Sequence, residues 1–427
     1  MAAHSVLTDE LVKQLIAVGQ VDVLVALPTF HNASSAAGAA RAAVLGLARH
    51  FPRARSALLH VDGGSSDGTP DIVLRASGPD LDREIRAQTL RTIQRISAPY
   101  DGLPTKATAL RAVFASADLL QARAIAVLDP TVTSVTPEWI AALIGPVLRD
   151  RRDFVAPVHQ RHPLDAPLAS QLVRPLVRAV YARRIEEPVA GEFGCSGAFV
   201  TRCLADAIWD REMAPLGVDA SLSLAALAGP FDVCQASLGP RVTAPDAPRP
   251  ALADVFRQVV GSIFACMEAQ QSAWITRDGA QEVPLAGEAP ASLADTTPLE
   301  AAPLVEGYRS GLRDLGDLLA PILEGGTLAA LREAAASDPL AFRVEDSIWV
   351  ATVYEFAAAY HRQVIHRDHL VQALVPLYLG RAASFLLECV GKDLAEIASR
   401  ADALALEFET MKPHLLRHWE PNHGGES

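Results

Sequence analysis

Short apolar runs that alternate with segments of helical periodicity constrain the fold of this chain more than any other feature. Three runs, at residues 21–30, 56–61 and 122–127, are apolar on both faces and lead into turn residues. Such runs suit strands buried inside a parallel sheet. Segments of helical spacing follow the first two runs, at 34–50 and 70–76. A further strand is predicted at 90–96, between the second and third runs, and it is followed by a helix at 107–120. The alternation predicts an α/β fold with a doubly wound parallel sheet, in which ligands bind at the carboxyl ends of the strands.

The character of the chain changes after residue 250. Helical periodicity dominates from there on, and the stretch 277–303 is rich in Ala, Pro, Gly and acidic residues, as in a long loop or linker. The predicted organisation is an N-terminal helix at 1–20, a sheet domain at 21–248, a helix packing on that domain at 249–276, the linker at 277–303 and a C-terminal helical domain at 304–427.

Composition and charge exclude several classes of protein. Half of the 427 residues are hydrophobic and 21% are charged, which indicates a folded core. The net charge of −12 argues against a nucleic-acid surface. Neither a signal peptide nor a membrane span is expected, because no apolar run of the required length is found. The five cysteines are widely spaced without a CxxC pair, which predicts reduced, buried thiols in a cytoplasmic protein.

Polar residues suited to a nucleotide ligand lie at the ends of the first two strands. Pro28 and Thr29 end the first strand, and Asp62 ends the second within the loop VDGGSSDGT. The glycines allow backbone groups to approach a ligand, and the carboxylate suits a ribose or base. The alternative is a tight Asx turn that caps the next helix, and the residues alone leave both interpretations open.

Four charged residues further along the chain are the candidates for chemistry. Lys106, in GLPTKATAL, precedes a helix start, where amide donors and the helix dipole favour a diphosphate, although a single Lys is more often simply solvated. Asp129 directly follows an apolar strand, where a carboxylate would hold a metal that bridges a diphosphate. Glu192 lies in a Gly-flanked loop and Asp219 opens a predicted helix, so both are candidates to face a sugar; Asp219 also suits a helix cap.

Taken in order, these segments resemble family-2 type glycosyltransferases with the GT-A fold. The resemblance is closer to bacterial glucosylglycerate synthases and their mannosylglycerate and glucosyl-phosphoglycerate relatives, and it covers nearly the whole chain. It rests on SVTPEWI (134–140), FVAPVHQRH (154–162), GEFGCSG (191–197), FRQVVGSIFACME (256–268), WVATVYEFAAAYHR (349–362) and LVPLYLGRAASFLLE (374–388). It implies a nucleotide-diphospho-sugar transferase with a Rossmann-like sheet and a C-terminal helical region.

The resemblance also implies an activity and a set of site residues. A hexose, most simply glucose, would be transferred from a nucleotide sugar to a small hydroxy acid such as D-glycerate with retention of its anomeric configuration. Mg²⁺ or Mn²⁺ would bind the diphosphate. Arg161 and His162 would bind the acceptor carboxylate, since Arg can do so bidentately. By the same resemblance Pro28, Thr29, Asp62, Lys106 and Asp129 would bind the donor, Asp129 would ligate the metal, and Glu192 and Asp219 would be catalytic.

This chain departs from the family pattern at the expected metal ligands. Thr131 stands where the family has the last Asp of its DxD triplet, and Thr243 where it has a metal-binding His. A hydroxyl is a poor replacement for either ligand, so the metal is expected to be weakened or absent, with Asp246 as the candidate replacement ligand. Two functions therefore stay open: an active glycosyltransferase, and a degenerate homologue that binds a nucleotide sugar or a protein partner.

A third hypothesis, a helical interaction protein, rests on residues 250–420. The segment YHRQVIHRDH (360–369) carries three histidines, whose spacing favours a solvated helix end over a metal site. The C-terminal helices are expected to cover the catalytic domain or to form a homodimer contact.

Overall fold

The computed structural model describes residues 6–85, 89–205, 209, 217–247, 251–288, 300–338 and 341–420. The chain forms two compact units. A sheet unit comprises Met1–Gln160, Val189–Arg249 and Val283–Ala291, and a helical unit comprises Arg161–Pro188, Pro250–Glu282 and Ser292–Ser427. The sequence prediction has one continuous domain at 21–248, whereas the structure places 161–188 in the helical unit. Within the predicted linker 277–303, residues 289–299 lie outside the described residues.

An eight-stranded sheet forms the centre of the sheet unit. Its strands, in chain order, are β1 (Val23–Thr29), β2 (Ser56–Asp62), β3 (Gln94–Pro99), β4 (Ala124–Val127), β5 (Phe154–Gln160), β7 (Phe193–Ser196), β8 (Val233–Pro240) and β10 (Leu285–Ala286). Their spatial order is β10-β8-β5-β7-β4-β1-β2-β3. All residues of β1, β2 and β4 are buried, as their apolar runs predict. The predicted α/β class is confirmed.

The direction of one strand corrects the prediction of a parallel sheet. Strand β7 runs antiparallel to both of its neighbours, β4 and β5, while the other pairs in the sheet are parallel. Strand direction leaves no trace in a short apolar run, because an antiparallel central strand is as buried as a parallel one. The consequence is functional: the start of β7 lies at the edge where the parallel strands end.

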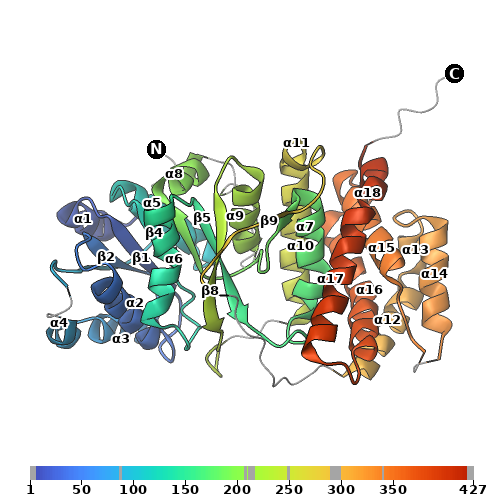
Figure 1. Cartoon of the computed structure of the whole chain (residues 1–427), viewed down its shortest axis with the longest axis horizontal. Coiled ribbons are helices and arrows are strands. Elements are labelled where there is room, and N and C mark those ends of the chain that lie inside the picture. Colours follow the sequence, from blue (N-terminus) through green and yellow to red (C-terminus); the bar gives the residue numbers. More distant parts are fainter. Residues whose placement is uncertain are drawn as a thin grey trace. The chain divides into compact units, whose positions relative to one another are not determined.

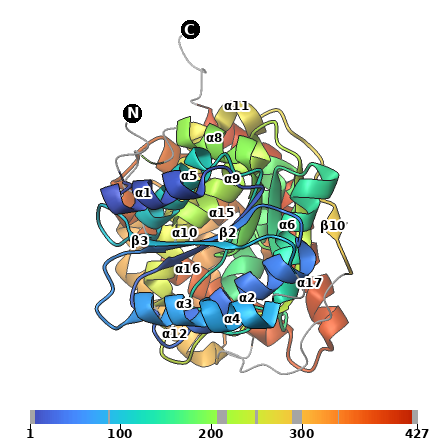
Figure 2. The ribbon, with the colours of Figure 1, turned by 90° about the vertical axis from the view of Figure 1, so that its left-hand side faces the viewer.

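Helices cover both faces of this sheet (Figures 1 and 2). One face carries α2 (Ala36–His50), α3 (Thr69–Ala76), α4 (Pro79–Ile85) and α6 (Pro137–Asp150). The other carries α1 (Asp9–Val18), α5 (Lys106–Leu119), α8 (Gly197–Ala205) and α9 (Gly217–Ala228). The helices predicted at 34–50, 70–76 and 107–120 correspond to α2, α3 and α5. The strand predicted at 90–96 is displaced to Gln94–Pro99.

The helical unit confirms the predicted C-terminal helical region. Its helices are η2 (Ala169–Val173), α7 (Arg174–Tyr181), α10 (Leu252–Ala269), α11 (Gln271–Trp274), α12 (Ala301–Asp314), α13 (Gly316–Leu319), α14 (Gly325–Ala336), α15 (Asp346–His361), α16 (Arg367–Glu388), α17 (Leu394–Thr410) and α18 (Lys412–Trp419). Two short strands, β6 (Arg183–Arg184) and β9 (Gln281–Glu282), pair beside them. Helix α16 packs against α12, α10 and α15.

Helix α16 is long and apolar enough to cross a membrane by length and composition alone. Its most apolar window has a mean hydropathy of 1.5, and 72% of that window is buried inside the structure. Arg381, within α16, is fully buried, and its guanidinium donates to Gln171 Oε1 at 3.0 Å and to the Val344 carbonyl at 2.9 Å. Burial among helices, with an internal Arg whose charge is paired with Asp346 at 2.8 Å, is typical of the core helix of a folded unit.

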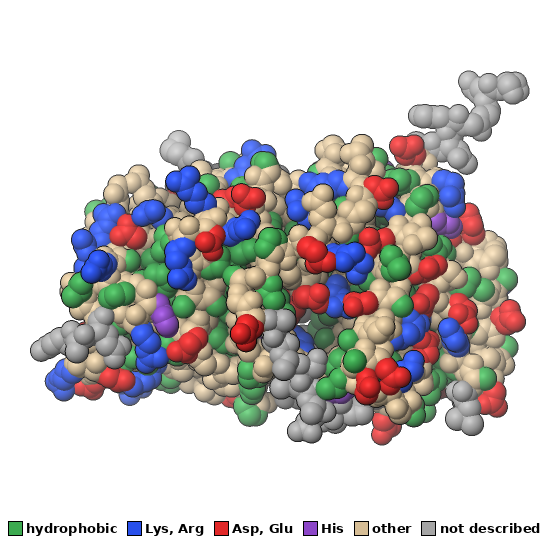
Figure 3. Space-filling model, viewed as in Figure 1, with side chains coloured by type: hydrophobic (Ala, Val, Ile, Leu, Met, Phe, Trp, Pro, Cys, Tyr) green, Lys and Arg blue, Asp and Glu red, His purple; other side chains and the backbone are tan. Residues whose placement is uncertain are grey.

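All five cysteines are buried free thiols, as predicted, while the cytoplasmic location stays a prediction. On the face of the molecule drawn in Figure 3, acidic and basic side chains are interspersed.

Candidate functional site

The ends of three strands bring charged residues to one edge of the sheet unit. Asp129 follows β4, and Arg241 directly follows β8. Strand β7 is antiparallel to β4, with Val127 opposite Phe193. Glu192 directly precedes Phe193, so it emerges beside the Asp129 loop at the same edge. The reversed direction of β7 thus adds a carboxylate where only strand carboxyl ends would otherwise meet.

A guanidinium bridge links the two carboxylates. Arg241 Nη2 lies 2.9 Å from Asp129 Oδ2, and Arg241 Nε lies 2.9 Å from Glu192 Oε1. The other carboxylate oxygen, Asp129 Oδ1, accepts hydrogen bonds from the Thr131 amide at 2.9 Å and the Thr131 hydroxyl at 2.7 Å. Both oxygens of Asp129 are therefore already engaged. Glu192 is fully buried, so Arg241 is also its charge partner in the protein interior.

A second buried ion pair joins two helix starts. Lys106 is the first residue of α5, and Asp219 is the third residue of α9. Lys106 Nζ lies 2.6 Å from Asp219 Oδ2, and only 4% of Asp219 is exposed. The interpretation of Lys106 as an ordinary solvated lysine is therefore wrong. The other oxygen, Asp219 Oδ1, is buried without a hydrogen-bond partner among the described residues.

Gly191 shows that the two ion pairs belong to one cluster. A Cβ atom at this position would lie 2.6 Å from Asp129 Oδ2 and 3.1 Å from Lys106 Nζ. The backbone of Gly191 thus lies directly against both charged groups, where any side chain would separate them. His159, in β5, adds a further ring: its Nε2 is 3.7 Å from Glu192 Oε2, and its ring contacts Trp139 with centroids 5.2 Å apart.

Two of the carboxylates in this cluster, Glu192 and Asp219, have pKa values shifted in opposite directions. Burial by itself would raise the pKa of Glu192, but His159, the Arg241 guanidinium and the Lys106 ammonium together lower it to about 2. Burial raises the pKa of Asp219 to about 6, because Lys106 offsets only part of the desolvation and the nearby carboxylates Asp129 and Glu192 add to it. Asp219, with its pKa raised to about 6, can therefore exchange a proton near neutral pH.

Lys106 remains a cation throughout this range. Burial alone would lower the pKa of Lys106, but the carboxylates of Asp219, Asp129 and Glu192 raise it above its ordinary value. Three carboxylates and two permanent cations thus share one largely buried space.

Residues at the ends of β1 and β2 form a separate hydrogen-bonded group. Asp62 Oδ2 accepts from the amides of Gly64 at 2.9 Å and Ser65 at 2.7 Å, and Asp62 Oδ1 accepts from the hydroxyls of Thr29 and Ser65, each at 2.7 Å. Pro28 is buried within β1. The Asp62 carboxylate therefore organises its own loop, as the Asx-turn alternative describes. The nucleotide contacts of Pro28, Thr29 and Asp62 stay predictions.

The remaining predicted site residues have partners elsewhere. Arg161 and His162 open the helical unit, where Arg161 Nη2 lies 2.6 Å from Glu187 Oε2 and His162 Nδ1 accepts from the Leu164 amide at 3.1 Å. In the sheet unit, Asp246 Oδ1 accepts from the Ser34 hydroxyl at 3.0 Å. The acceptor-binding role of Arg161 and His162, and the metal-binding role of Asp246, stay predictions.

The side chains around Asp129 do not offer the ligand atoms that a divalent cation needs. Such a cation needs several free oxygen ligands, preferably carboxylates. Both oxygens of Asp129 accept hydrogen bonds, the hydroxyl of Thr131 donates to one of them, and the guanidinium of Arg241 places a positive charge at the other. Thr243 forms a β-bridge with Val132 and so follows the same loop. A metal at Asp129 would have to bind beside the Arg241 guanidinium, whose positive charge opposes it.

Two residues of this cluster were missed by sequence reasoning. Arg241 stands two positions before Thr243 in GPRVT, and His159 lies within FVAPVHQRH, both segments that the family resemblance singles out. The available signal was position: a charged or titratable residue at the carboxyl end of an apolar strand. Nothing in the sequence, however, pairs residue 241 with residues 129 and 192.

A surface cavity of about 610 Å³ lies at the opposite edge of the same sheet. Its lining includes Arg123 before β4, Asp153 before β5 and Ser196 at the end of β7. Because the parallel strands begin at this edge, the cavity is separate from the charged cluster.

Comparison with known proteins gives similarity in solved structures only. No protein-family model matches the chain, and no curated protein sequence matches it. Glucosyl-3-phosphoglycerate synthase from Mycobacterium tuberculosis, in complex with Mg²⁺ and uridine diphosphate, is 18% identical over 60% of this chain and 83% of that chain, with a TM-score of 0.42. The same enzyme with phosphoglyceric acid is 16% identical over 65% and 91%, with a TM-score of 0.43. These similarities carry no information on the ligands of this chain.

Proposed function

We propose that this chain is a glycosyltransferase that binds a nucleotide-diphosphate sugar at the charged cluster and does so without a divalent metal. The observation that carries the proposal is the Arg241 guanidinium held between Asp129 and Glu192, beside the Lys106–Asp219 ion pair. Two partly exposed cations at the carboxyl edge of the sheet, one of them at a helix N-terminus, provide the charge that a diphosphate requires. The sequence resemblance to GT-A glycosyltransferases supports the same ligand class.

In the proposed reaction a hexose passes from the nucleotide sugar to a small hydroxylated acceptor. The hexose is glucose, the acceptor is a hydroxy acid such as D-glycerate, and the anomeric configuration is retained. The bond from the anomeric carbon to the diphosphate oxygen breaks, and the acceptor oxygen bonds to that carbon on the same face. The acceptor proton passes to the leaving diphosphate. Lys106 and Arg241 stabilise the charge that develops on this leaving group. Removing one such electrostatic donor typically lowers the rate by roughly 10²–10³-fold.

The two candidate catalytic carboxylates have different roles in this proposal. Glu192, whose pKa is about 2, stays ionised and orients Arg241. Asp219 has a buried Oδ1 atom without a described partner, which suits a hydroxyl of the donor sugar or the acceptor. A buried acceptor atom left unpaired costs about 1–3 kcal/mol, and a bound hydroxyl would remove that cost.

The second candidate function is binding of a nucleotide sugar or a protein partner without turnover. One observation favours it: both cations of the cluster are already paired with carboxylates, so a diphosphate must compete with Asp219, Asp129 and Glu192. The two functions differ in product formation, and a homologue that binds a protein partner differs in its ligand as well.

The proposed location is cytoplasmic, and five buried free thiols support it. A homodimer contact through the C-terminal helices stays a prediction.

The first test is calorimetric titration of the full chain with UDP-, GDP- and ADP-glucose, each with Mg²⁺, Mn²⁺ or EDTA. We expect one donor to bind with the same affinity in all three conditions. Transfer of glucose to D-glycerate or 3-phosphoglycerate would then support the glycosyltransferase function. Donor binding without product formation would support the second function. Binding that EDTA abolishes and Mn²⁺ restores would contradict the metal-independent site. Failure of all donors to bind would contradict nucleotide-sugar binding at this site and leave only the protein-partner form of the second function.

The variant Arg241→Gln tests the residue that carries the proposal. We expect donor affinity to fall about 10- to 100-fold, because a hydrogen bond to a charged group contributes about 1.5–3 kcal/mol. Arg123→Gln is the matched control, since it removes the same charge at the opposite edge of the sheet. Arg241→Lys keeps a cation between the two carboxylates, so it separates loss of binding from loss of folding. Equal donor affinity in the Arg241 and Arg123 variants would refute the assignment.

A further inference from the structure

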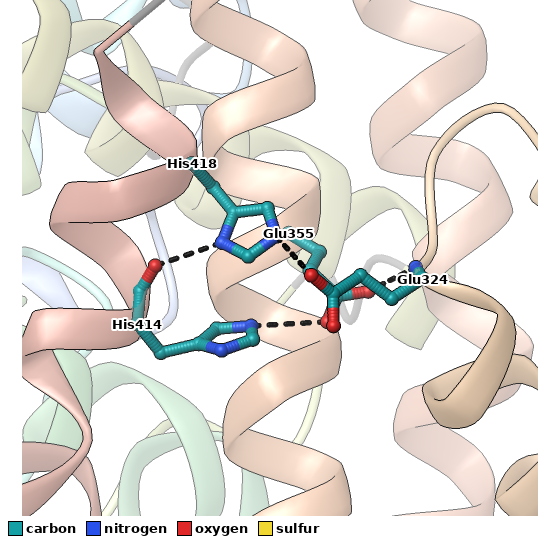
Figure 4. A group of neighbouring side chains, drawn as sticks. All are labelled: Glu324, Glu355, His414 and His418. Atoms are coloured by element: carbon teal, nitrogen blue, oxygen red, sulfur yellow. Dashed lines mark hydrogen bonds and ion pairs between the residues drawn. The ribbon is translucent and has the colours of Figure 1, made fainter. Parts of the chain in front are cut away.

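Two histidines and two glutamates converge in the helical unit, outside the cluster described above. His414 and His418 lie four residues apart on α18, Glu355 lies on α15, and Glu324 is the residue before α14 (Figure 4). One ligand atom from each of the four lies within 4.8 Å of the others. Three separate helices thus present two imidazoles and two carboxylates to one point.

The hydrogen bonds of His418 assign its tautomer. Its Nδ1 lies 2.8 Å from the backbone carbonyl of His414. A carbonyl only accepts, so Nδ1 carries the hydrogen, and a neutral imidazole then has its lone pair on Nε2. That Nε2 atom lies 2.8 Å from Glu324 Oε1, which is also an acceptor. Two acceptors at this distance require a cation between them, either a proton or a metal ion. A backbone carbonyl on the distal nitrogen is also the usual partner of a metal-binding histidine.

Glu355 supplies the inner wall of this group. Its side chain is fully buried, and its Oε1 accepts from the Thr327 hydroxyl at 2.8 Å and lies 3.0 Å from His414 Nε2. Its Oε2 accepts from the backbone amide of Glu324 at 2.8 Å. These bonds hold the carboxylate in one orientation. With both imidazoles neutral, the four side chains carry a formal charge of −2, which a divalent ion would balance.

We propose that Glu324, Glu355, His414 and His418 form a binding site for a divalent transition-metal ion, with Zn²⁺ as the reference ion. Imidazole and carboxylate ligands suit this ion, and histidines four residues apart on a helix present their rings to the same side. The site tethers α18 and α15 to the start of α14. Its role is structural, because all four ligand positions come from the protein.

To bind the ion, the two closest pairs of ligand atoms must separate slightly and the more distant pairs, all within 4.8 Å, must approach one another. Tetrahedral zinc with bonds of about 2.0 Å places its ligands about 3.3 Å apart. His418 Nε2–Glu324 Oε1 and His414 Nε2–Glu355 Oε1, at 2.8 and 3.0 Å, are already closer than that. Arg417 Nη2 lies 3.3 Å from His414 Nδ1. When Nε2 of His414 binds the ion, Nδ1 carries the hydrogen, so the Arg417 guanidinium must turn away, and its exposed position permits this. Glu324, with 58% of its side chain exposed, leaves a path for the ion.

The proposal is tested with the full chain, stripped with EDTA and dialysed free of the chelator. Calorimetric titration with ZnCl₂ at neutral pH should show one saturable site per chain. Titration with Co²⁺ should give the visible absorption of a tetrahedral complex. In His418→Gln we expect zinc affinity to fall on the order of 100-fold, and in Glu324→Gln on the order of 10-fold. Neither residue lies in the core, so both variants should keep the far-ultraviolet circular dichroism of the parent.

The matched control is the double variant His366→Gln/His369→Gln. These two imidazoles are also neighbours, with ring centroids 5.2 Å apart, but they lie outside the four-residue group. Zinc binding should be unchanged in this variant. Absence of a saturable site in the parent would overturn the proposal, as would equal affinity in the parent and His418→Gln. In either case the cation shared by His418 and Glu324 is a proton only.

Discussion

At the scale of single residues, the charged cluster depends on matched opposite charges in a space with little water. Glu192 is fully buried and Asp219 nearly so, and each is tolerated because a cation lies within 3 Å. Removing one partner of such a pair typically costs about 3–5 kcal/mol, since the other charge is left buried and unpaired. Arg241 is therefore both the proposed ligand for a diphosphate and a structural requirement of the cluster.

From the raised pKa of Asp219 we predict that the protein takes up a proton when a nucleotide diphosphate binds. Its pKa is about 6, above the ordinary value, so it is mostly ionised at pH 8 and holds Lys106. A diphosphate adds negative charge and draws Lys106 away, and both changes raise the pKa of Asp219 further. The bound state therefore holds more protons than the free state, and affinity should rise as pH falls from 8 towards 6, by at most about tenfold per pH unit.

The measurement is calorimetry of donor binding in two buffers that differ in ionisation enthalpy, repeated at several pH values. The difference between the buffers counts the protons taken up. Asp219→Asn should bind with little pH dependence over the same range, whereas Asp246→Asn, a second carboxylate variant of the sheet unit, should behave like the parent. Proton release on binding, or a pH dependence that survives in Asp219→Asn, would contradict the coupling.

At the scale of elements, small residues permit the close approach of α12 and α16 in the helical unit. A Cβ atom at Gly380 would lie 2.3 Å from the ring of Tyr308, and one at Gly311 would lie 2.2 Å from Pro376. The Tyr308 ring cannot move aside easily, because it is fully buried and its hydroxyl donates to the Leu331 carbonyl at 2.7 Å. Glycine at these helical positions is therefore explained by packing and not by backbone flexibility.

Gly380→Ala is expected to destabilise the helical unit by about 1–3 kcal/mol, the usual cost of adding volume to a filled core. Gly261→Ala in α10 is the matched control, because its Cβ would meet only Val371 Cγ2 at 3.9 Å. Replacing a helical glycine by alanine without a clash should raise stability by up to about 1 kcal/mol. Urea unfolding followed by circular dichroism measures both changes. Equal effects of the two substitutions would contradict the packing argument.

At the scale of the whole molecule, the net charge of −12 sets the kind of partner that the chain can attract. Long-range repulsion opposes binding to a polyanion, although a local pair of cations can still hold a small diphosphate. The difference lies in distance: charges beyond a Debye length of about 10 Å are screened, and those in a buried site are not.

We therefore expect no binding of duplex DNA at protein concentrations up to about 10⁻⁵ M and low salt, because non-specific affinity comes from released counterions that this chain cannot displace. Fluorescence anisotropy of a labelled duplex measures this directly. A saturable complex whose affinity falls steeply with salt would contradict it.

Much of the sheet unit was predictable from local pattern. The apolar runs that became β1, β2 and β4 are buried along their whole length. Lys106, Asp129 and Asp219 were named as site candidates from their positions at a strand end or helix start, and Glu192 from its Gly-flanked loop. Hydrophobic periodicity and helix-start chemistry are properties of neighbouring residues. The sequence alone therefore determined the α/β class, the helical C-terminal region and four of the charged residues of the cluster, but not Arg241.

Only the tertiary structure decided which of these charges meet. The direction of β7 places Glu192 beside Asp129, and the end of β8 places Arg241 between them. Likewise, α14, α15 and α18 bring Glu324 and Glu355 to His414 and His418 from distant parts of the sequence. Periodicity describes which face of an element is buried, but the partner of a buried charge depends on strand order, register and helix packing, which involve residues far apart in the chain.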